Sequence, residues 1–210
     1  MALEGFYVAR VPNKDAQDIV VENHYLHRRA PCSNAFGLFD AKGRVRGVVL
    51  YGTPSSAPLR SGICGPRYAK DVAELTRLWV ADDVPKNGES FLIGRTLRDA
   101  GKPIIVSFAD TAQGHTGTIY QATNWIYTGL SAKRTSWRVE GLDKHGQTLA
   151  DKMSATEMRR VYGDRFSLEE RSRKHRYLYV TAKGTKRREI LRSLRYPVLP
   201  YPDKFTPDIF

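Results

Sequence analysis

The segment that most constrains the fold is KPIIVSFAD, residues 102–110, in which an apolar run with β-branched residues leads to Ser107 and Asp110. A short apolar run of this kind is typical of a strand that is buried on both faces. Such a strand lies inside a sheet that helices cover on both sides, so the segment indicates an α/β (α+β) fold with a central sheet. Ligands of open sheets usually bind at strand ends, which makes Asp110 a candidate site residue.

The other segments alternate between strand and helix patterns, as such a fold requires. Strands are expected at residues 6–11, 36–40, 44–52, 73–80, 125–131, 136–141 and 175–180, the second and third of them as a β-hairpin. Helices are expected at residues 14–28, 89–101, 114–124 and 186–195, and helical or turn-like structure at 154–163 and 167–176. The Pro-, Gly- and Ser-rich segment 53–66 is expected to be an irregular loop.

The net charge limits the partners of the chain. It is +12, with an isoelectric point near 9.8, and such values draw a protein to polyanions, of which nucleic acid is the commonest inside cells. Residues 151–195 carry 14 Lys and Arg against 6 Asp and Glu. We therefore expect a catalytic core at residues 1–141 and a basic C-terminal extension at 142–210, whose Pro-rich tail docks on the core or stays mobile.

Composition argues against several protein classes. No apolar run approaches the roughly 18 residues of a membrane helix, and the first residues lack a signal-peptide pattern, so we expect a soluble intracellular protein. Cys32 and Cys64 show neither a CxxC spacing nor a Cys/His cluster, which argues against a disulfide framework and a structural zinc site. His24 and His27 lie three residues apart, on one face of an expected helix, which permits metal ligation together with Asp110 or Glu74 but is a weak signal alone.

The turn VPKNGES, residues 84–90, leads into an expected helix. Backbone amides at a glycine-containing helix start, reinforced by Lys86, form a seat for phosphate or pyrophosphate. The turn lacks the patterns of a P-loop and of a dinucleotide site, so an ordinary helix start is an equally good interpretation. The candidate cofactor-binding residues are Lys86, Asn87, Gly88 and Ser90.

A family resemblance rests on residues 107–129, SFADTAQGHTGTIYQATNWIYTG, in which a tyrosine-bearing helix leads into an aromatic-initiated strand. This arrangement resembles the end of the GNAT-type acyltransferase fold, beside the thiol end of coenzyme A. The resemblance implies a mixed central sheet flanked by helices. Together with HYLHRRAP, GVVLYG, ELTRLWV and SRKHRYLY, the segment resembles the phage Mom family, GNAT-like proteins that convert adenine in DNA to N6-(carbamoylmethyl)adenine. The resemblance spans roughly residues 20–180. It implies a phage-encoded, transferase-like enzyme that acts on double-stranded DNA in the cytoplasm of the infected bacterium and protects phage DNA from host restriction.

The resemblance also selects candidate catalytic residues. The matching polar residues are His24, Tyr25, Glu74, Thr76, Arg77, Ser107, Asp110, His115, Tyr120 and Tyr127. From these we assign catalysis to Asp110, Tyr120, Ser107, Glu74, Arg77 and His24. Bond formation at the weakly nucleophilic adenine N6 requires a group that handles its proton, and Asp110 is the first candidate. Tyr120 is the candidate acid for the leaving group. The alternatives are a structural ion pair for Glu74 and Arg77, a core position for Tyr120 and a helix-start role for His115.

Further residues are candidates for binding DNA. The aromatic candidates stack on a base, and the basic ones contact phosphates. They are Tyr127, Trp125, Arg173, Lys174, Arg176, Arg187 and Arg188. The group donor stays open, with an acyl-CoA-like donor and an iron centre as the two hypotheses. Two other functions also stay open: an ordinary GNAT N-acetyltransferase that uses acetyl-CoA, and a DNA-binding protein without catalysis.

Overall fold

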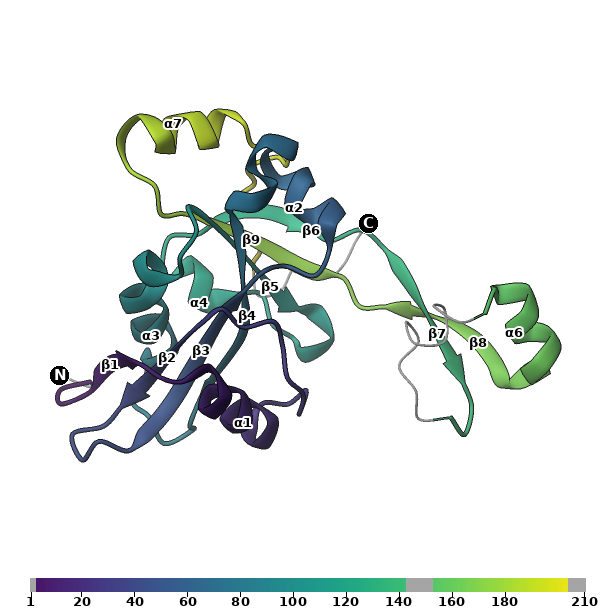
Figure 1. The fold of residues 1–210 in the computed structure, drawn as a ribbon, viewed down its shortest axis with the longest axis horizontal. Coiled ribbons are helices and arrows are strands. Elements are labelled where there is room, and N and C mark those ends of the chain that lie inside the picture. The colour runs from purple at the N-terminus through teal and green to yellow at the C-terminus, as the bar shows by residue number, and fades with distance from the viewer. Residues whose placement is uncertain (1–2, 143–152, 204–210) are drawn as a thin grey trace.

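The computed structural model describes residues 3–142 and 153–203 (Figure 1). Its main body contains a seven-stranded sheet with the order β1-β2-β3-β4-β5-β9-β6. These strands are β1 (Tyr7–Arg10), β2 (Asn34–Phe39), β3 (Val45–Gly52), β4 (Val72–Val80), β5 (Ile104–Asp110), β9 (Lys174–Val180) and β6 (Ile126–Leu130). Neighbouring strands are antiparallel except β4 and β5, which are parallel. The predicted mixed sheet is confirmed.

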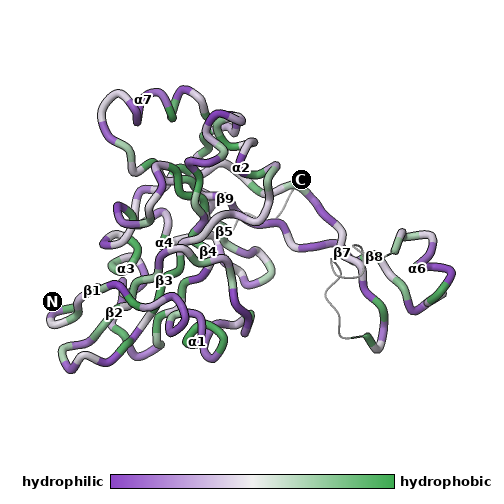
Figure 2. Tube along the Cα trace, in the orientation of Figure 1, coloured by the Kyte–Doolittle hydropathy of each residue, from purple (hydrophilic) through white to green (hydrophobic). Residues whose placement is uncertain are grey.

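Helices cover both faces of this sheet, as the doubly buried β5 requires. The helices are α1 (Asn13–Asn23), α2 (Ala57–Cys64), α3 (Gly88–Thr96), α4 (Thr118–Gln121) and α7 (Gly184–Arg192). Leu92 of α3 and Tyr120 of α4 share one core cluster with β2 to β5, whereas Ile63 of α2 and Ile190 of α7 pack against β4, β5 and β9 in another. Apolar segments accordingly run through the central strands in Figure 2.

Several local expectations are corrected. The predicted loop at residues 53–66 contains α2, which begins where the Ser56 side chain accepts a hydrogen bond from the Leu59 amide at 3.3 Å. The helix expected to reach residue 28 ends at Asn23, because His24 adopts an extended conformation. Of the helix expected at residues 114–124, only the single turn α4 forms. The expected hairpin of β2 and β3 is confirmed.

An arm, which we define as the described residues 132–142 and 153–173, projects from the main body (Figure 1). It contains a two-stranded antiparallel ribbon of β7 (Arg134–Val139) and β8 (Phe166–Arg171), with helix α6 (Ala155–Tyr162) between them in sequence. The helical or turn-like structure expected at 167–176 is wrong, since these residues lie in β8 and β9. Val139, Met158 and Phe166 form a small core of the arm's own.

After the arm, the chain returns to the main body. β9 belongs to the segment predicted as an extension, yet it lies inside the central sheet between β5 and β6. The C-terminal tail docks on β6 and the turn before it: the Leu199 amide donates to the Tyr127 carbonyl at 3.0 Å and the Tyr201 hydroxyl donates to the Trp125 carbonyl at 2.7 Å. No helix in the described part of the chain is long and apolar enough to span a membrane.

Candidate active site

A split in the sheet creates the site. β4 and β5 pair only where Val72–Glu74 lies beside Ile104–Val106, whereas β5 pairs with β9 along its whole length, from Ile104 to Asp110. A cavity of about 1520 Å³ opens where β4 and β5 separate, and its wall includes residues from α2, α4 and the base of the arm. All six predicted catalytic side chains line this cavity: His24, Glu74, Arg77, Ser107, Asp110 and Tyr120.

Ser107 and Tyr120 form a hydrogen-bonded pair at the inner end of the cavity. The Ser107 hydroxyl donates to the Leu75 carbonyl at 3.1 Å and lies 2.7 Å from the Tyr120 hydroxyl. Because the single serine proton goes to Leu75, the tyrosine donates within the pair. Burial raises the pKa of Tyr120 to about 12, so its hydroxyl keeps its proton at neutral pH.

Glu74 and Arg77 lie on the cavity side of β4. Burial raises the pKa of Glu74 above its ordinary value, although the positive charges of Arg77 and Lys174 oppose the shift. The Arg77 guanidinium donates to the Thr76 carbonyl at 2.6 Å, and its Nε is buried with no hydrogen-bond partner among the described residues. Because burial destabilises the ionised form of Glu74, its carboxylate is a strong proton acceptor. The buried Nε–H of Arg77 has no partner in the described part of the chain, so it favours a ligand with an oxygen acceptor.

Asp110 ends β5 and is held more firmly than expected. One carboxylate oxygen accepts hydrogen bonds from Ser172 at 2.7 Å and from the Ala112 amide at 3.1 Å, and the other lies 2.8 Å from the Lys174 ammonium. Burial alone would raise the pKa of Asp110, but the hydrogen bonds of Lys174 and Ser172 outweigh it and hold the pKa below its usual value. Asp110 is therefore an ionised anchor for the base of the arm and a weak proton acceptor.

His24 lies in the cavity wall as a neutral ring. Burial, together with the charges of Arg77 and His27, lowers the pKa of His24 to about 4. Its Nδ1 accepts a hydrogen bond from the Leu26 amide at 3.1 Å, so Nε2 carries the proton. The shared helix face predicted for His24 and His27 is wrong, since α1 ends before both. Among the residues that the structure describes, no group of three or more His, Cys, Asp or Glu side chains could hold a metal ion.

The predicted cofactor turn lies beside the cavity. Lys86 and Asn87 line a second, smaller cavity of about 390 Å³, whose wall shares Asp82 and Glu89 with the first. The Ser90 hydroxyl donates to the Asn87 carbonyl at 3.1 Å, while Gly88 is buried. Two carboxylates next to the amides of a helix start oppose the binding of a pyrophosphate, so this geometry supports the ordinary helix-start interpretation.

Three of the predicted DNA contacts are corrected. Trp125 is 1% exposed and packs against Tyr120 and Tyr179, so it has no ring face to offer a base. Tyr127 is also buried, with its hydroxyl 2.8 Å from His175 Nδ1. Arg176 donates to Thr128 and stacks on Tyr196, so its guanidinium serves packing. All three lie on β6, β9 or the turn before β6, where sequence alone suggested exposure.

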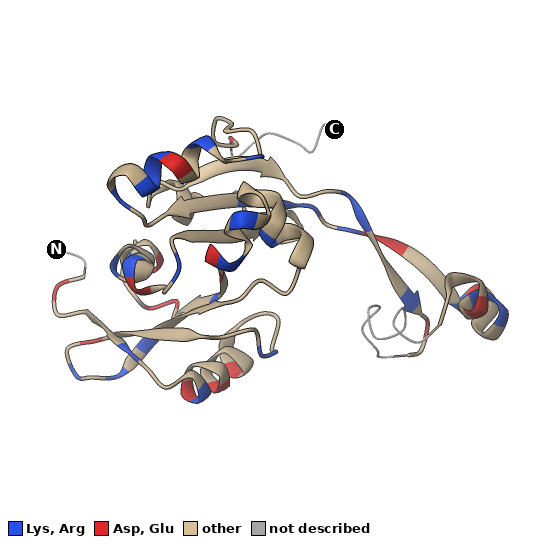
Figure 3. Cartoon of the chain, turned by 45° about the horizontal axis from the view of Figure 1, so that its top comes forward, with Lys and Arg blue, Asp and Glu red and all other residues tan. Residues whose placement is uncertain are grey.

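The four remaining predicted DNA contacts lie in two places. Arg187 and Arg188 are exposed on α7, whereas Arg173 and Lys174 lie at the base of the arm. Figure 3 shows basic residues in blue both on the helices of the main body and along the arm. Sequence reasoning missed the cavity residues Ser56, Arg134 and Ser172. They come from α2 and from the arm, and no motif connects them with the segments around Glu74 and Asp110.

Comparison with solved structures gives low sequence identities. A spermidine/spermine N-acetyltransferase of Vibrio cholerae is 11% identical, with a TM-score of 0.48, over 86% of this chain and 95% of that one. An N-acetyltransferase of Staphylococcus aureus is 12% identical, with a TM-score of 0.47, over 84% of this chain and 99% of that one.

Sequence relatives are more informative. The methylcarbamoylase Mom of Escherichia phage Mu is 28% identical over 190 residues, which cover 87% of this chain and 73% of the relative. The model of the Mom protein family matches residues 5–203, nearly the whole chain and every residue of the cavity described above. The chain belongs to the Mom protein family.

Proposed function

We propose that the chain is a phage DNA modification enzyme that converts adenine in DNA to N6-(carbamoylmethyl)adenine, in the cytoplasm of the infected bacterium, and so protects phage DNA from host restriction. The observation that carries the proposal is the gathering of all six predicted catalytic side chains on one cavity of about 1520 Å³. Family membership and the methylcarbamoylase of phage Mu support the choice of reaction.

The reaction needs one proton acceptor and one proton donor. A bond forms between adenine N6 and the methylene carbon of a carbamoylmethyl donor, and the bond from that carbon to the donor's leaving group breaks. The N6 proton leaves to a base, and the leaving group takes up a proton as it departs. The exocyclic amine of adenine is a weak nucleophile, so the base has to be positioned within hydrogen-bond reach.

The environments of the cavity residues distribute these roles. Glu74, whose pKa is raised, accepts the N6 proton. Tyr120, whose hydroxyl is protonated at neutral pH, gives up its hydrogen bond to Ser107 and transfers that proton to the leaving group. The buried Nε of Arg77 donates to the carbonyl oxygen of the carbamoyl group. Asp110 holds Lys174 and Ser172 and thereby fixes the base of the arm against the cavity. This division replaces Asp110 by Glu74 as the proton acceptor.

Nucleoside mass spectrometry tests the proposal. DNA from cells that express the wild-type protein is expected to contain a deoxyadenosine heavier by a carbamoylmethyl group. The Asp110→Ala variant should lose this product, because Lys174 and Ser172 lose their shared partner. Asp99→Ala, a change of the same kind at an exposed position outside the cavity, is the control and should modify DNA as the wild type does.

The other two functions give different results in the same cells. An acetyltransferase would leave the DNA unmodified and turn over acetyl-CoA with a small amine in the absence of DNA. A DNA-binding protein without catalysis would leave the DNA unmodified. Its Asp110→Ala variant would bind DNA with the same affinity as the wild type. Unmodified DNA in cells with abundant folded protein would contradict the proposal.

The affinity for duplex DNA is expected to fall with increasing salt, in part because basic residues of α7 contact phosphates. Arg188 is exposed, and a charge reversal there should remove about one phosphate contact. The negative slope of log affinity against log salt should then become shallower by about 0.9. Lys42→Glu, a reversal in the exposed turn between β2 and β3, is the matched control. If Arg188→Glu and the wild type give equal slopes in a fluorescence titration, Arg188 on α7 does not contact the DNA.

A further inference from the structure

The two faces of the arm's ribbon differ in chemistry. Residues directly opposite each other in an antiparallel pair lie on the same face, and faces alternate along each strand. One face carries the pairs Trp137 with Leu168 and Val139 with Phe166, and α6 packs on it. We call the other one the polar face, and it consists of Arg134, Ser136, Arg138, Ser167, Glu169 and Arg171.

Most side chains of the polar face are exposed to solvent. Arg134, Arg138, Ser167, Glu169 and Arg171 are exposed, and Ser136 is half-buried. Arg138 and Glu169 lie diagonally across the ribbon and form an ion pair at 2.9 Å, with both side chains largely exposed. Such an exposed pair contributes little to stability, so the structure of the arm does not require it.

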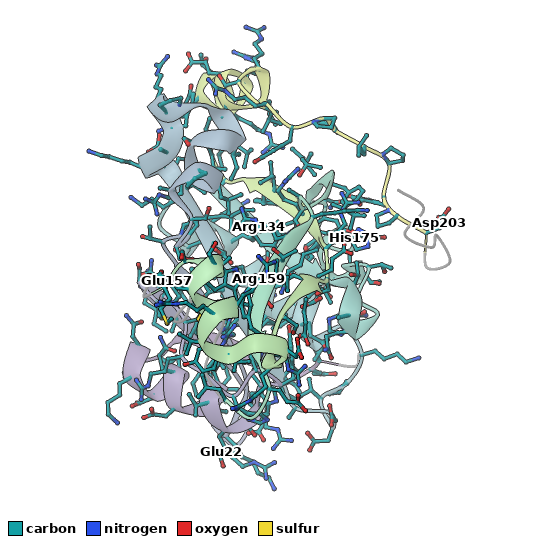
Figure 4. The ribbon with its side chains drawn as sticks, turned by 90° about the vertical axis from the view of Figure 1, so that its right-hand side faces the viewer. Glu22, Arg134, Glu157, Arg159, His175 and Asp203 are labelled. Carbon is teal, nitrogen blue, oxygen red and sulfur yellow. The ribbon has the colours of Figure 1, made fainter. Side chains whose placement is uncertain are left out.

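The polar face also continues into the active-site cavity. Arg134 and Arg171 are directly opposite each other at the base of the ribbon, and both line the cavity. Figure 4 views the molecule from the side of the arm, with Arg134 labelled on the ribbon and Arg159 on α6. The polar face therefore leads outward from the wall of the cavity.

From this placement we infer that the polar face of the arm enters the major groove beside the target adenine and reads the neighbouring base pairs. This inference rests on the proposed function, in that duplex DNA is the substrate. The major groove admits a two-stranded β-ribbon, and arginine, glutamate and serine are side chains that hydrogen-bond to base edges there. Six ribbon residues extend roughly 20 Å, which is the rise of about six base pairs.

A binding selection tests the inference without depending on catalysis. A library of duplexes with one fixed adenine and randomised flanks is bound to the full-length protein, and the retained duplexes are sequenced. Arg138→Ala and Glu169→Gln are each expected to reduce the wild-type preference at one or two flanking positions about tenfold or more. Arg160→Ala, in the same arm but on the exposed side of α6, should keep the preference. Thermal unfolding shows that each variant is folded.

The outcomes separate this inference from the proposed function. An unchanged preference in both ribbon variants overturns the inference, even if adenine is modified in cells. Reduced preference in a protein that modifies no adenine supports the inference and contradicts the proposed function. A change in oligomeric state of Arg138→Ala, measured by sedimentation, without a change in preference would assign the polar face to a second copy of the chain and would also overturn the inference.

Discussion

The Glu74→Gln variant is expected to modify DNA about 10²–10⁴-fold more slowly than the wild type, the usual contribution of a positioned proton acceptor. Glutamine has nearly the same size and keeps a carbonyl oxygen, so the cavity wall beside Arg77 is preserved and the fold should be retained. The measurement is the rate of product formation on a defined duplex, with DNA affinity determined in parallel. Equal rates for Glu74→Gln and the wild type would exclude Glu74 as the base.

The pH dependence of the same variant distinguishes a base from a structural residue. The pKa of Glu74 is raised above 4.5, and a base works only when ionised, so the wild-type rate should fall as pH decreases through this raised pKa. The Glu74→Gln variant should lack this acidic limb, and Glu74→Asp should retain it at a lower rate. An acidic limb that persists in Glu74→Gln would place the titrating group elsewhere.

The stability of Glu74→Gln should change in the opposite direction to its activity. Because the folded-state pKa lies above the ordinary value, ionising Glu74 costs folding free energy, and this cost is absent at low pH and develops as pH rises through the folded-state pKa. Above that range, Glu74→Gln is expected to unfold at a higher temperature than the wild type. Below the ordinary carboxyl pKa, where Glu74 is neutral in both folded and unfolded chains, the two should unfold at similar temperatures.

Gly117→Ala is expected to be the most damaging small substitution near the site. Gly117 precedes α4 with a φ of +81°, and a Cβ there would lie 2.3 Å from the Tyr177 ring. The strained backbone and the overlap together should cost roughly 2–4 kcal/mol of folding free energy. A backbone shift that relieves this overlap also moves α4 and Tyr120, so product formation should fall as well. Urea unfolding and the product assay measure the two effects.

Gly114→Ala is the matched control for this prediction. Gly114 has a similar φ of +66°, but nothing lies within 4 Å of the added Cβ. Its substitution should therefore cost only the backbone strain, about 1 kcal/mol. If both variants lose the same stability, the contact with Tyr177 is not what requires glycine at position 117.

Local patterns predicted most of the central sheet, because the signals lie within single segments. The apolar run before Ser107 and the paired strands at 36–40 and 44–52 show their burial and turns directly in sequence. The central position of β9 is different, since its hydrogen bonds go to β5 and β6, far away in the chain. A high positive charge around Arg173 and Arg187 suggested an extension, whereas burial of the apolar residues between them decides the position of the strand.

The residues that gather on the cavity were predictable from the sequence, whereas the environment of each side chain was not. The six catalytic candidates follow from matched segments, and the structure places them on one cavity. Its position at a strand end makes Asp110 the first candidate for the base, yet the partners that lower its pKa are Lys174 and Ser172, about sixty residues later in the chain. Likewise, an aromatic residue such as Trp125 has no local signal that separates a buried ring from one that is exposed to a base.

The connection of the arm to the sheet has a consequence for how such enzymes diversify. β6 and β9 are adjacent antiparallel strands, Leu130 pairs with His175, and the Ser131 amide donates to the Lys174 carbonyl at 2.8 Å. The arm thus leaves and rejoins the sheet at neighbouring points, like an insertion in the turn of a hairpin. Closely spaced ends allow an inserted segment to change length and surface at little cost to the host fold. The part of the arm beyond Arg134 and Arg171 can therefore be replaced during evolution without a change in the residues that line the cavity.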